Sequence, residues 1–118
     1  MESERREFPR IPIRVAVHYT QLDESGGIES ELMGLALDVS LGGLLLESKD
    51  FISAENVSVH FVDIENTVRT IGCRMIYSRR VRDGGVHTGL RFQGSNEAKV
   101  DFVSHIIRAY FYRRKRAA

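Results

Sequence analysis

Apolar residues recur at every second position through most of the chain and switch to helical spacing only near its end. A period of two places successive side chains on opposite faces of a strand, so each such segment predicts a half-buried β-strand. Polar stretches separate these segments, and one of them, Asp83-Gly84-Gly85, is typical of a hairpin turn. The predicted strands cover residues 13–20, 32–39, 44–46, 57–62, 67–79 and 86–92.

The alternation also predicts which side chains each strand buries. The residues expected to face inward are Ile13, Val15, Val17 and Tyr19 in the first strand, Met33, Leu35, Leu37 and Val39 in the second, Ile71, Cys73, Met75 and Tyr77 in the fifth, and Val86, Thr88, Leu90 and Phe92 in the sixth. Asp38, Gly89 and Arg91 are therefore expected on the outer face.

Helical spacing of apolar residues begins after residue 95. Ser95 is a suitable N-cap and Glu97 places an acid in the first turn, so residues 95–113 are predicted to form an amphipathic helix. Six short strands with no helix among them would leave exposed edges unless the sheet closes on itself. The predicted fold class is therefore all-β with a C-terminal helix: a small six-stranded antiparallel β-barrel plus one amphipathic α-helix.

The length and composition are those of one ordinary domain. The chain has 118 residues, 42% of them hydrophobic, which is enough for a single core. We expect one domain over residues 1–118, with a flexible Arg-rich arm (1–12), the barrel (13–93) and the helix (95–113). No apolar run approaches the ~20 residues that span a bilayer, and the N-terminus has no secretory h-region. We therefore expect no membrane span and a cytoplasmic location.

Charge and reactive side chains argue against several function classes. Lys and Arg total 17 against 16 for Asp and Glu, a formal charge of +1, so a general DNA- or RNA-binding protein is not expected. The four histidines lie on separate predicted elements without short ligand spacing, so we expect no metal site. Cys73 is expected to be a buried core thiol. No nucleophile with a nearby base stands out, so we expect no catalytic residues and no enzyme.

Two polar stretches carry chemistry that the core does not need. Residues 5–10 supply arginines, whose planar donor forks suit phosphate or a guanine edge. Asp38–Gly43 offers a carboxylate, a hydroxyl and two glycines, which permit a sharp turn and close approach of a flat ligand. Two strands joined by a loop most simply form an antiparallel hairpin, which places the start of the first beside the end of the second. We therefore expect the two stretches to meet.

The two stretches also match known motifs. Arg6-Glu7-Phe8-Pro9-Arg10 fits RxxxR, and Asp38-Val39-Ser40-Leu41-Gly42-Gly43 fits DxSxxG. In this order, on either side of one hairpin, they resemble the PilZ domain family of bacterial cyclic di-GMP receptors. Gly43-Leu44-Leu45-Leu46-Glu47 and Gly89-Leu90-Arg91-Phe92 support the resemblance, which covers residues 5–112.

The resemblance implies a ligand and a role for particular residues. In proteins that this one resembles, arginines at the positions of Arg6 and Arg10 grip the bases and phosphates of cyclic di-GMP. Residues matching Asp38 and Ser40 bind a guanine edge, and the glycine at Gly43 shapes the turn. No other cofactor is implied. The predicted ligand-binding residues are Arg5, Arg6, Arg10, Asp38, Ser40, Gly42, Gly43 and Gly89.

The implied function is that of a non-enzymatic receptor. Ligand binding would order the N-terminal arm over the outer barrel face and change the surface that a partner protein, as yet unidentified, reads. Gly89 would leave room for the ligand on that face. Arg5 beside Arg6 adds the hypothesis of a stacked pair of ligand molecules per site. The protein is expected to be a monomer or a homodimer.

Three alternatives stay open. Asp38–Gly43 can be a plain turn in which the Asp and Ser side chains bond only to local backbone. A PilZ-like interaction adaptor that binds no nucleotide and works through the C-terminal helix fits the same fold. A small barrel that binds single-stranded nucleic acid would need a basic groove with exposed aromatic rings, which the near-neutral charge disfavours.

Overall fold

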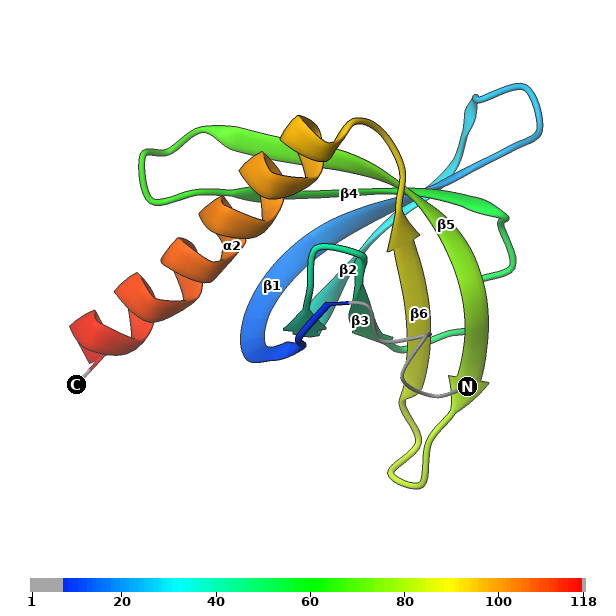
Figure 1. Ribbon diagram of the computed structural model, residues 1–118. Coiled ribbons are helices and arrows are strands. Elements are labelled where there is room, and N and C mark those ends of the chain that lie inside the picture. The colour runs from blue at the N-terminus through cyan, green and yellow to red at the C-terminus, as the bar shows by residue number, and fades with distance from the viewer. Residues whose placement is uncertain (1–7, 118) are drawn as a thin grey trace.

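The computed structural model describes residues 8–117 and is a closed six-stranded antiparallel barrel followed by one long helix (Figure 1). The strands follow one another around the barrel in the order β1-β2-β3-β6-β5-β4. The predicted fold class is confirmed. The elements are β1 (Ile11–Leu22), β2 (Ile28–Val39), β3 (Gly43–Ser48), β4 (Asn56–Val62), β5 (Val68–Arg80), β6 (Val86–Phe92) and α2 (Asn96–Ala117).

The core fills the barrel and extends under the helix. The predicted inward residues of β1 and β6 are all buried. Phe102 of α2 is 1% exposed and meets Phe61 and Phe92 edge to face, with ring centroids 5.3 and 5.5 Å away. The N–H of Ala98 donates to the Ser95 side chain at 3.1 Å, so the predicted N-cap is confirmed. Because α2 continues to Ala117, it is longer than the expected 95–113.

The predicted faces of β2 are wrong over its first half. Met33 is 63% exposed, whereas Ala36, expected outside, is fully buried. The pairing of β2 with β3 slips between Ala36 and Asp38, which leaves Leu37 as an extra residue. Such a bulge reverses the faces of the residues beyond it. Asp38 and Val39 lie after the bulge and have the predicted orientation, with Val39 buried.

A second bulge explains the one wrong assignment in β5. The pairing of β5 with β6 slips between Met75 and Tyr77, so Tyr77 is 38% exposed instead of buried. Ser78 turns inward in its place, and its hydroxyl lies 2.8 Å from the hydroxyl of buried Thr88. The barrel therefore gains an exposed aromatic ring on its outer face.

The described residues include no helix with the length and apolar character of a membrane span.

Candidate ligand-binding site

The pairing of β1 with β2 brings the described part of the arm beside the predicted turn. Pro12 is the register partner of Asp38, and Ile11 is the partner of Val39. The residues before β1 therefore lie next to the turn that follows β2. The Phe8 ring lies against this turn, since a methyl group built on Gly42 would be 3.4 Å from it. The predicted meeting of the two stretches is confirmed for residues 8–10.

Arg10 and Asp38 face each other loosely. The guanidinium Nη1 of Arg10 lies 3.9 Å from Oδ2 of Asp38, beyond hydrogen-bond distance. The Arg10 side chain is 49% exposed and that of Asp38 is 21% exposed. An ionised carboxylate can accept at both oxygens and a guanidinium donates through five N–H groups. Toward the other described residues, both groups therefore keep most of their hydrogen-bonding capacity unused.

The turn after β2 is closed by its own backbone and by Ser40. The Ser40 N–H donates to the carbonyl of Gly43 at 2.9 Å, and the Gly42 N–H donates to Oγ of Ser40 at 3.1 Å. Ser40 thus has the local role expected of a serine in a turn. Among the described residues, no acceptor takes its hydroxyl hydrogen. Asp38 makes no comparable bond to backbone within the described residues, so the plain-turn alternative accounts for Ser40 and not for Asp38.

Gly43 is required by the close approach of two strands. It pairs with Arg91 of β6, and a methyl group built on it would overlap the carbonyl oxygen of Leu90. The Phe92 N–H donates to the Gly42 carbonyl at 2.9 Å at the same place. The backbone under the candidate site is therefore fixed by the barrel, while the side chains above it are not.

On the outer face of the barrel beside Asp38, residues that pair across neighbouring strands form a row. Asp38 pairs with Leu45, Leu45 with Gly89, and Gly89 with Tyr77. Neighbouring strands are about 4.8 Å apart, so the row runs about 15 Å across four strands. Leu45 is half-buried and gives the row an apolar centre. A second row on the same face, two residues further along the strands, holds Gly43, Arg91 and Arg74.

Gly89 has a packing partner within this row. A methyl group built on Gly89 would overlap the Tyr77 ring, which covers the glycine from the neighbouring strand. The guanidinium of Arg79 lies over the same ring, with its carbon 5.5 Å from the ring centroid. Gly89 as a ligand contact stays a prediction. The sequence did not point to Tyr77, because only the bulge in β5 turns it outward.

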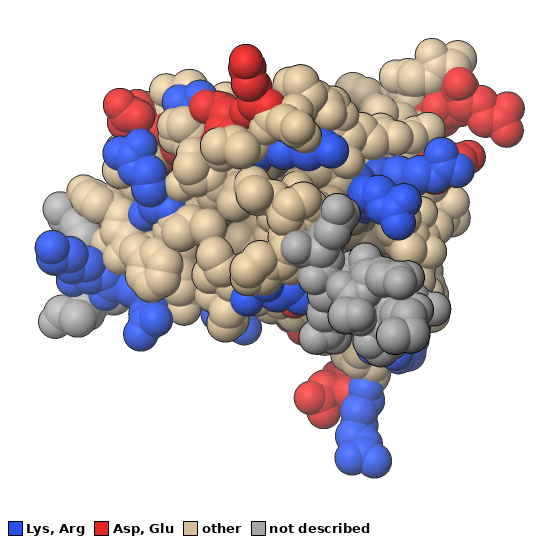
Figure 2. All heavy atoms as spheres, in the orientation of Figure 1, with Lys and Arg blue, Asp and Glu red and all other residues tan. Residues whose placement is uncertain are grey.

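Arg5 and Arg6 lie outside the described residues, so their predicted roles stay predictions. Charged side chains in the described part do not form a continuous groove on the face shown in Figure 2. On that face basic residues lie in several separate places, among them the C-terminal end of α2 and the tip of the β5–β6 turn, with acidic residues between them. Basic residues scattered in this way do not suit a single-stranded nucleic acid, which needs a basic groove that follows its backbone.

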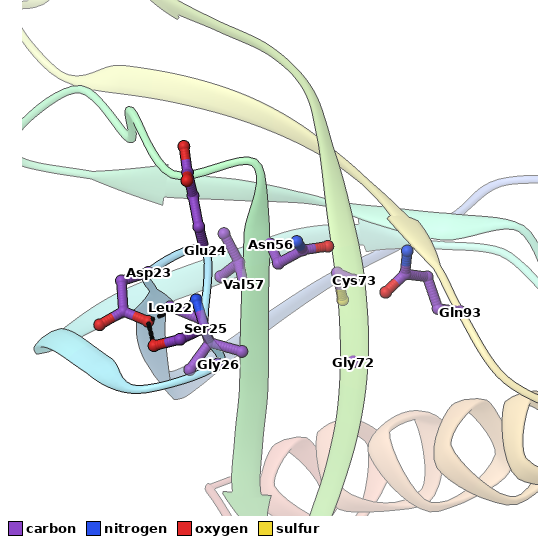
Figure 3. A pocket seen from close by; sticks show the side chains of 10 residues that line it. All are labelled: Leu22, Asp23, Glu24, Ser25, Gly26, Asn56, Val57, Gly72, Cys73 and Gln93. Atoms are coloured by element: carbon purple, nitrogen blue, oxygen red, sulfur yellow. Dashed lines mark hydrogen bonds between the residues drawn. The ribbon is translucent and has the colours of Figure 1, made fainter.

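A shallow hollow of about 380 Å³ lies at the other end of β1 (Figure 3). Cys73 lies in its wall, and burial raises the pKa of this thiol to about 12. The thiol is therefore protonated at neutral pH and is a poor nucleophile. The hollow contains none of the predicted ligand-binding residues. It is lined by Leu22, Asp23, Glu24, Ser25, Gly26, Asn56, Val57, Gly72, Cys73 and Gln93.

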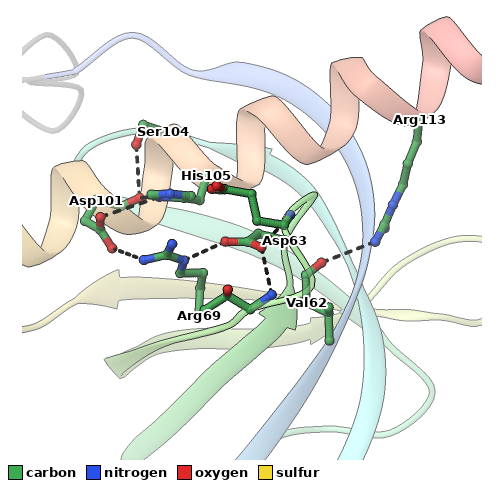
Figure 4. A network of polar contacts seen from close by, with 9 residues as sticks. Val62, Asp63, Arg69, Asp101, Ser104, His105 and Arg113 are labelled. Carbon is green, nitrogen blue, oxygen red and sulfur yellow. Dashed lines mark hydrogen bonds and ion pairs between the residues drawn. The ribbon is translucent and has the colours of Figure 1, made fainter.

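Asp63 and Arg69 form a network that joins α2 to the β4–β5 hairpin (Figure 4). The Arg69 Nε donates to Oδ2 of Asp63 at 2.7 Å and its Nη1 to Asp101 of α2 at 3.3 Å. Asp63 Oδ1 also accepts the N–H groups of Glu65 and Thr67, both at 2.9 Å. The Arg69 guanidinium and these donors lower the pKa of Asp63 to about 2.

Two groups of side chains within the described residues could hold a metal ion. In each group the ligating atoms lie within 4.8 Å of one another. In the group around Asp63, the Arg69 guanidinium is already bonded to Asp63 at 2.7 Å, which opposes binding of a second cation there. Among the described residues, no Lys or Arg forms an ion pair with the other group. The groups are His18, Glu31 and His60, and Asp63, Glu65 and His105.

The chain is similar to known proteins over nearly all of its length. A family model described as PilZ domain matches residues 4–112. Among solved structures, it is similar to the PilZ domain with c-di-GMP of YcgR from Escherichia coli, at 19% identity over 96% of this chain and 97% of that one, with a TM-score of 0.64. No curated protein sequence matches the chain.

Two further solved structures contain a similar fold within a longer chain. The Bacillus subtilis inhibitor of motility, MotI/DgrA, is 16% identical, with 88% of this chain and 50% of that one covered and a TM-score of 0.64. K. pneumonia MrkH in its apo state is 15% identical, with 93% and 53% covered and a TM-score of 0.57. The chain therefore spans about half the length of these two proteins. At such identities the likeness shows the fold.

Proposed function

The chain belongs to the PilZ domain family, and on this premise we propose that it is a non-enzymatic receptor for cyclic di-GMP. One observation carries the proposal: Arg10 and Asp38 lie side by side at the open end of the β1–β2 hairpin, 3.9 Å apart, and neither side chain hydrogen-bonds to another described residue. The similar YcgR domain has c-di-GMP in its structure. The proposed location is the cytoplasm.

The hydrogen-bonding groups of guanine and phosphate match those of Arg10, Asp38 and Ser40. The N1–H and N2–H₂ donors of guanine suit the two acceptor oxygens of Asp38, and Ser40 can donate its hydroxyl hydrogen to a base or phosphate oxygen. The Arg10 fork suits a phosphate or the O6 and N7 edge of a guanine. Gly42 and Gly43 have no side chains that would cover the turn, so a flat base can approach the backbone.

The apolar row next to Asp38 gives the rest of the ligand a surface. Half-buried Leu45 and the exposed Tyr77 ring that covers Gly89 together form an apolar surface, on which a purine could rest. Arg91 follows in the second row, on the same outer face. We include Tyr77 and Arg91 in the proposed site, although the sequence motifs do not contain them.

The arm would provide the signal. Arg6 would join Arg10 on the ligand and close residues 1–10 over the barrel face, which changes the surface offered to a partner protein. Ligand can favour this closed arrangement only by the difference in its affinity for the closed and open forms. Arg5 would stack on a further guanine and so hold a second ligand molecule.

The second candidate function, an interaction adaptor that binds no nucleotide, has one observation in its favour. The helix α2 runs on past the barrel to Ala117, and Phe111 near its end is 51% exposed. An exposed aromatic ring on a helix is a suitable contact for another protein. The adaptor and the receptor differ in one measurable property, which is nucleotide binding.

Isothermal titration with cyclic di-GMP tests the proposal. We expect binding to the wild-type chain and a loss of at least about 30-fold in Arg10→Ala or Arg6→Ala, because each removes charge-assisted hydrogen bonds. Arg108→Ala is the matched control, since Arg108 is exposed on α2, and it should bind like wild type. Full affinity in both site variants would contradict the receptor, and no binding to wild type would favour the adaptor.

The same titration gives the stoichiometry. Two ligand molecules per chain in wild type, reduced to one in Arg5→Ala, would support a stacked pair. One molecule per chain in wild type would contradict the pair and leave the receptor proposal intact.

A further inference from the structure

Three side chains from three neighbouring strands meet on the outer face of the barrel, away from the candidate ligand site. His18 of β1 is the register partner of His60 on β4, and the two rings are stacked with centroids 5.1 Å apart and planes 13° from parallel. Glu31 of β2 reaches the same place, with its Oε1 3.9 Å from Nε2 of His60. The sequence separates these residues by up to 42 positions, and closure of the barrel brings them together.

The three side chains are available for binding. Among the residues that the structure describes, neither imidazole makes a hydrogen bond to the protein, and Glu31 is the one carboxylate within 4.0 Å of a His60 ring nitrogen. The side chains of His60 and Glu31 are 26% and 53% exposed, so solutes can reach them. Zinc-type cations prefer as ligands the nitrogen atoms of neutral imidazoles and the oxygen atoms of ionised carboxylates.

We infer that His18, His60 and Glu31 bind a divalent transition-metal cation of the zinc type. All their ligating atoms lie within 4.8 Å of one another. Ligands at about 2 Å from one Zn²⁺ in tetrahedral geometry lie about 3.3 Å apart, so small side-chain rotations complete the set. Three protein ligands leave the fourth position to water or to another molecule. This inference replaces the expectation of no metal site, which rested on spacing in the sequence.

The strands hold the three ligands in place. β1 is paired with β2 on one side and with β4 on the other, so the backbone at His18 cannot move away from either neighbour without loss of ladder hydrogen bonds. A preformed backbone lowers the entropy that metal binding must overcome. The bound cation would tie β2, β1 and β4 together across the face of the barrel.

The metal site and the nucleotide site are separate. His18 follows Pro12, the partner of Asp38, by six residues along β1, a distance of about 20 Å at 3.3 Å per residue. Neither proposal depends on the other. Loss of metal binding with intact cyclic di-GMP binding, or the reverse, would identify which of the two is wrong.

Titration of Zn²⁺ alone into the full-length, untagged chain tests the inference. We expect about one Zn²⁺ per chain and at least a tenfold weaker affinity in His18→Gln and in His60→Gln, since even loss of a residue that only supports a metal ligand weakens binding 10- to 100-fold. Two controls should bind like wild type: His87→Gln, whose ring faces Glu47, and His105→Gln, which belongs to the other group.

Thermal unfolding without metal shows whether the variants fold. Substitutions of these two solvent-accessible rings should leave the melting temperature within about 2 °C of wild type. Absence of Zn²⁺ binding in wild type would overturn the inference. So would equal binding by wild type, His18→Gln and His60→Gln, or a loss of binding in His105→Gln alone.

Discussion

Two pairs of aspartate and arginine in this barrel have the same chemistry and opposite surroundings. Asp63 has a fully buried side chain, bonds Arg69 at 2.7 Å and accepts two backbone N–H groups. Asp38 faces Arg10 at 3.9 Å, and both side chains are partly exposed. The first pair uses its hydrogen-bonding capacity inside the protein. The second pair makes no hydrogen bond to the rest of the described residues, so its side chains can bind a ligand.

The difference separates structural from ligand-binding ion pairs. A carboxylate with all its acceptors occupied contributes to folding, and its removal leaves buried donors unpaired. A loose, exposed pair contributes about 0–1 kcal/mol to stability. We therefore expect substitutions at Asp63 to change the free energy of unfolding and substitutions at Asp38 to change ligand affinity.

The rigid backbone under the loose pair gives the largest expected effect on stability. Gly43→Ala places a methyl group onto the Leu90 carbonyl oxygen, so β3 and β6 must separate. We expect the free energy of unfolding in urea to fall by about 2–3 kcal/mol, which is typical of an overpacked site. Gly84→Ala is a poor control because Gly84 has a φ of 91°; Gly72→Ala is a better one, since only the Gln93 side chain lies near it. An unchanged Gly43→Ala protein would contradict the assigned role of this glycine.

The structural pair comes next. Asp63→Ala leaves the Arg69 guanidinium and two backbone N–H groups without their acceptor, so we expect the melting temperature to fall by about 5–10 °C. Cyclic di-GMP affinity, measured below the melting temperature, should stay within twofold of wild type. Weakened ligand binding in a folded Asp63→Ala protein would remove the distinction between the two pairs.

Acid should act through the same residue. The pKa of Asp63 is about 2 in the folded protein, below its usual value near 4. A carboxyl whose folded pKa is depressed stabilises the protein above its unfolded pKa, and this stabilisation is lost as pH falls through the folded pKa. We therefore expect stability to decline between about pH 4 and pH 2. Urea unfolding of Asp63→Asn over this range should show a shallower decline, and an equal slope would exclude Asp63 as the cause.

The loose pair should have the smallest effect on stability. Asp38→Ala and Arg10→Ala are each expected to change the free energy of unfolding by no more than about 0.5 kcal/mol. Gly89→Ala belongs in the same class, because the clashing Tyr77 ring is exposed and can swing aside. A melting temperature lowered by more than about 5 °C in Asp38→Ala would show that this carboxylate is structural.

Much of this arrangement can be predicted from the sequence, and the exceptions have a common cause. Alternation and the hairpin rule predicted six strands, the closed barrel and the meeting of residues 8–10 with the turn. The bulge after Ala36 and the one before Tyr77 each insert a residue that a period of two cannot detect. When the alternation is continued through such a bulge, the residues beyond it are assigned to the opposite face, as for Met33 and Tyr77.

The histidine pair shows a second limit of the sequence. His18 and His60 meet only because β1 pairs with β4 when the barrel closes. That pairing joins strands distant in sequence, and no local pattern specifies its register. Knowing the register of β1 with β4 would have been enough to place the two rings side by side.

Titration of cyclic di-GMP into the Asp38→Asn protein tests whether the Asp38 carboxylate binds the ligand, because this change keeps the shape of the side chain, removes its charge and replaces one acceptor oxygen with an NH₂ donor. A charge-assisted hydrogen bond is worth about 2 kcal/mol, so the account predicts binding about 30-fold weaker than wild type at an unchanged melting temperature. Wild-type affinity in Asp38→Asn would contradict it.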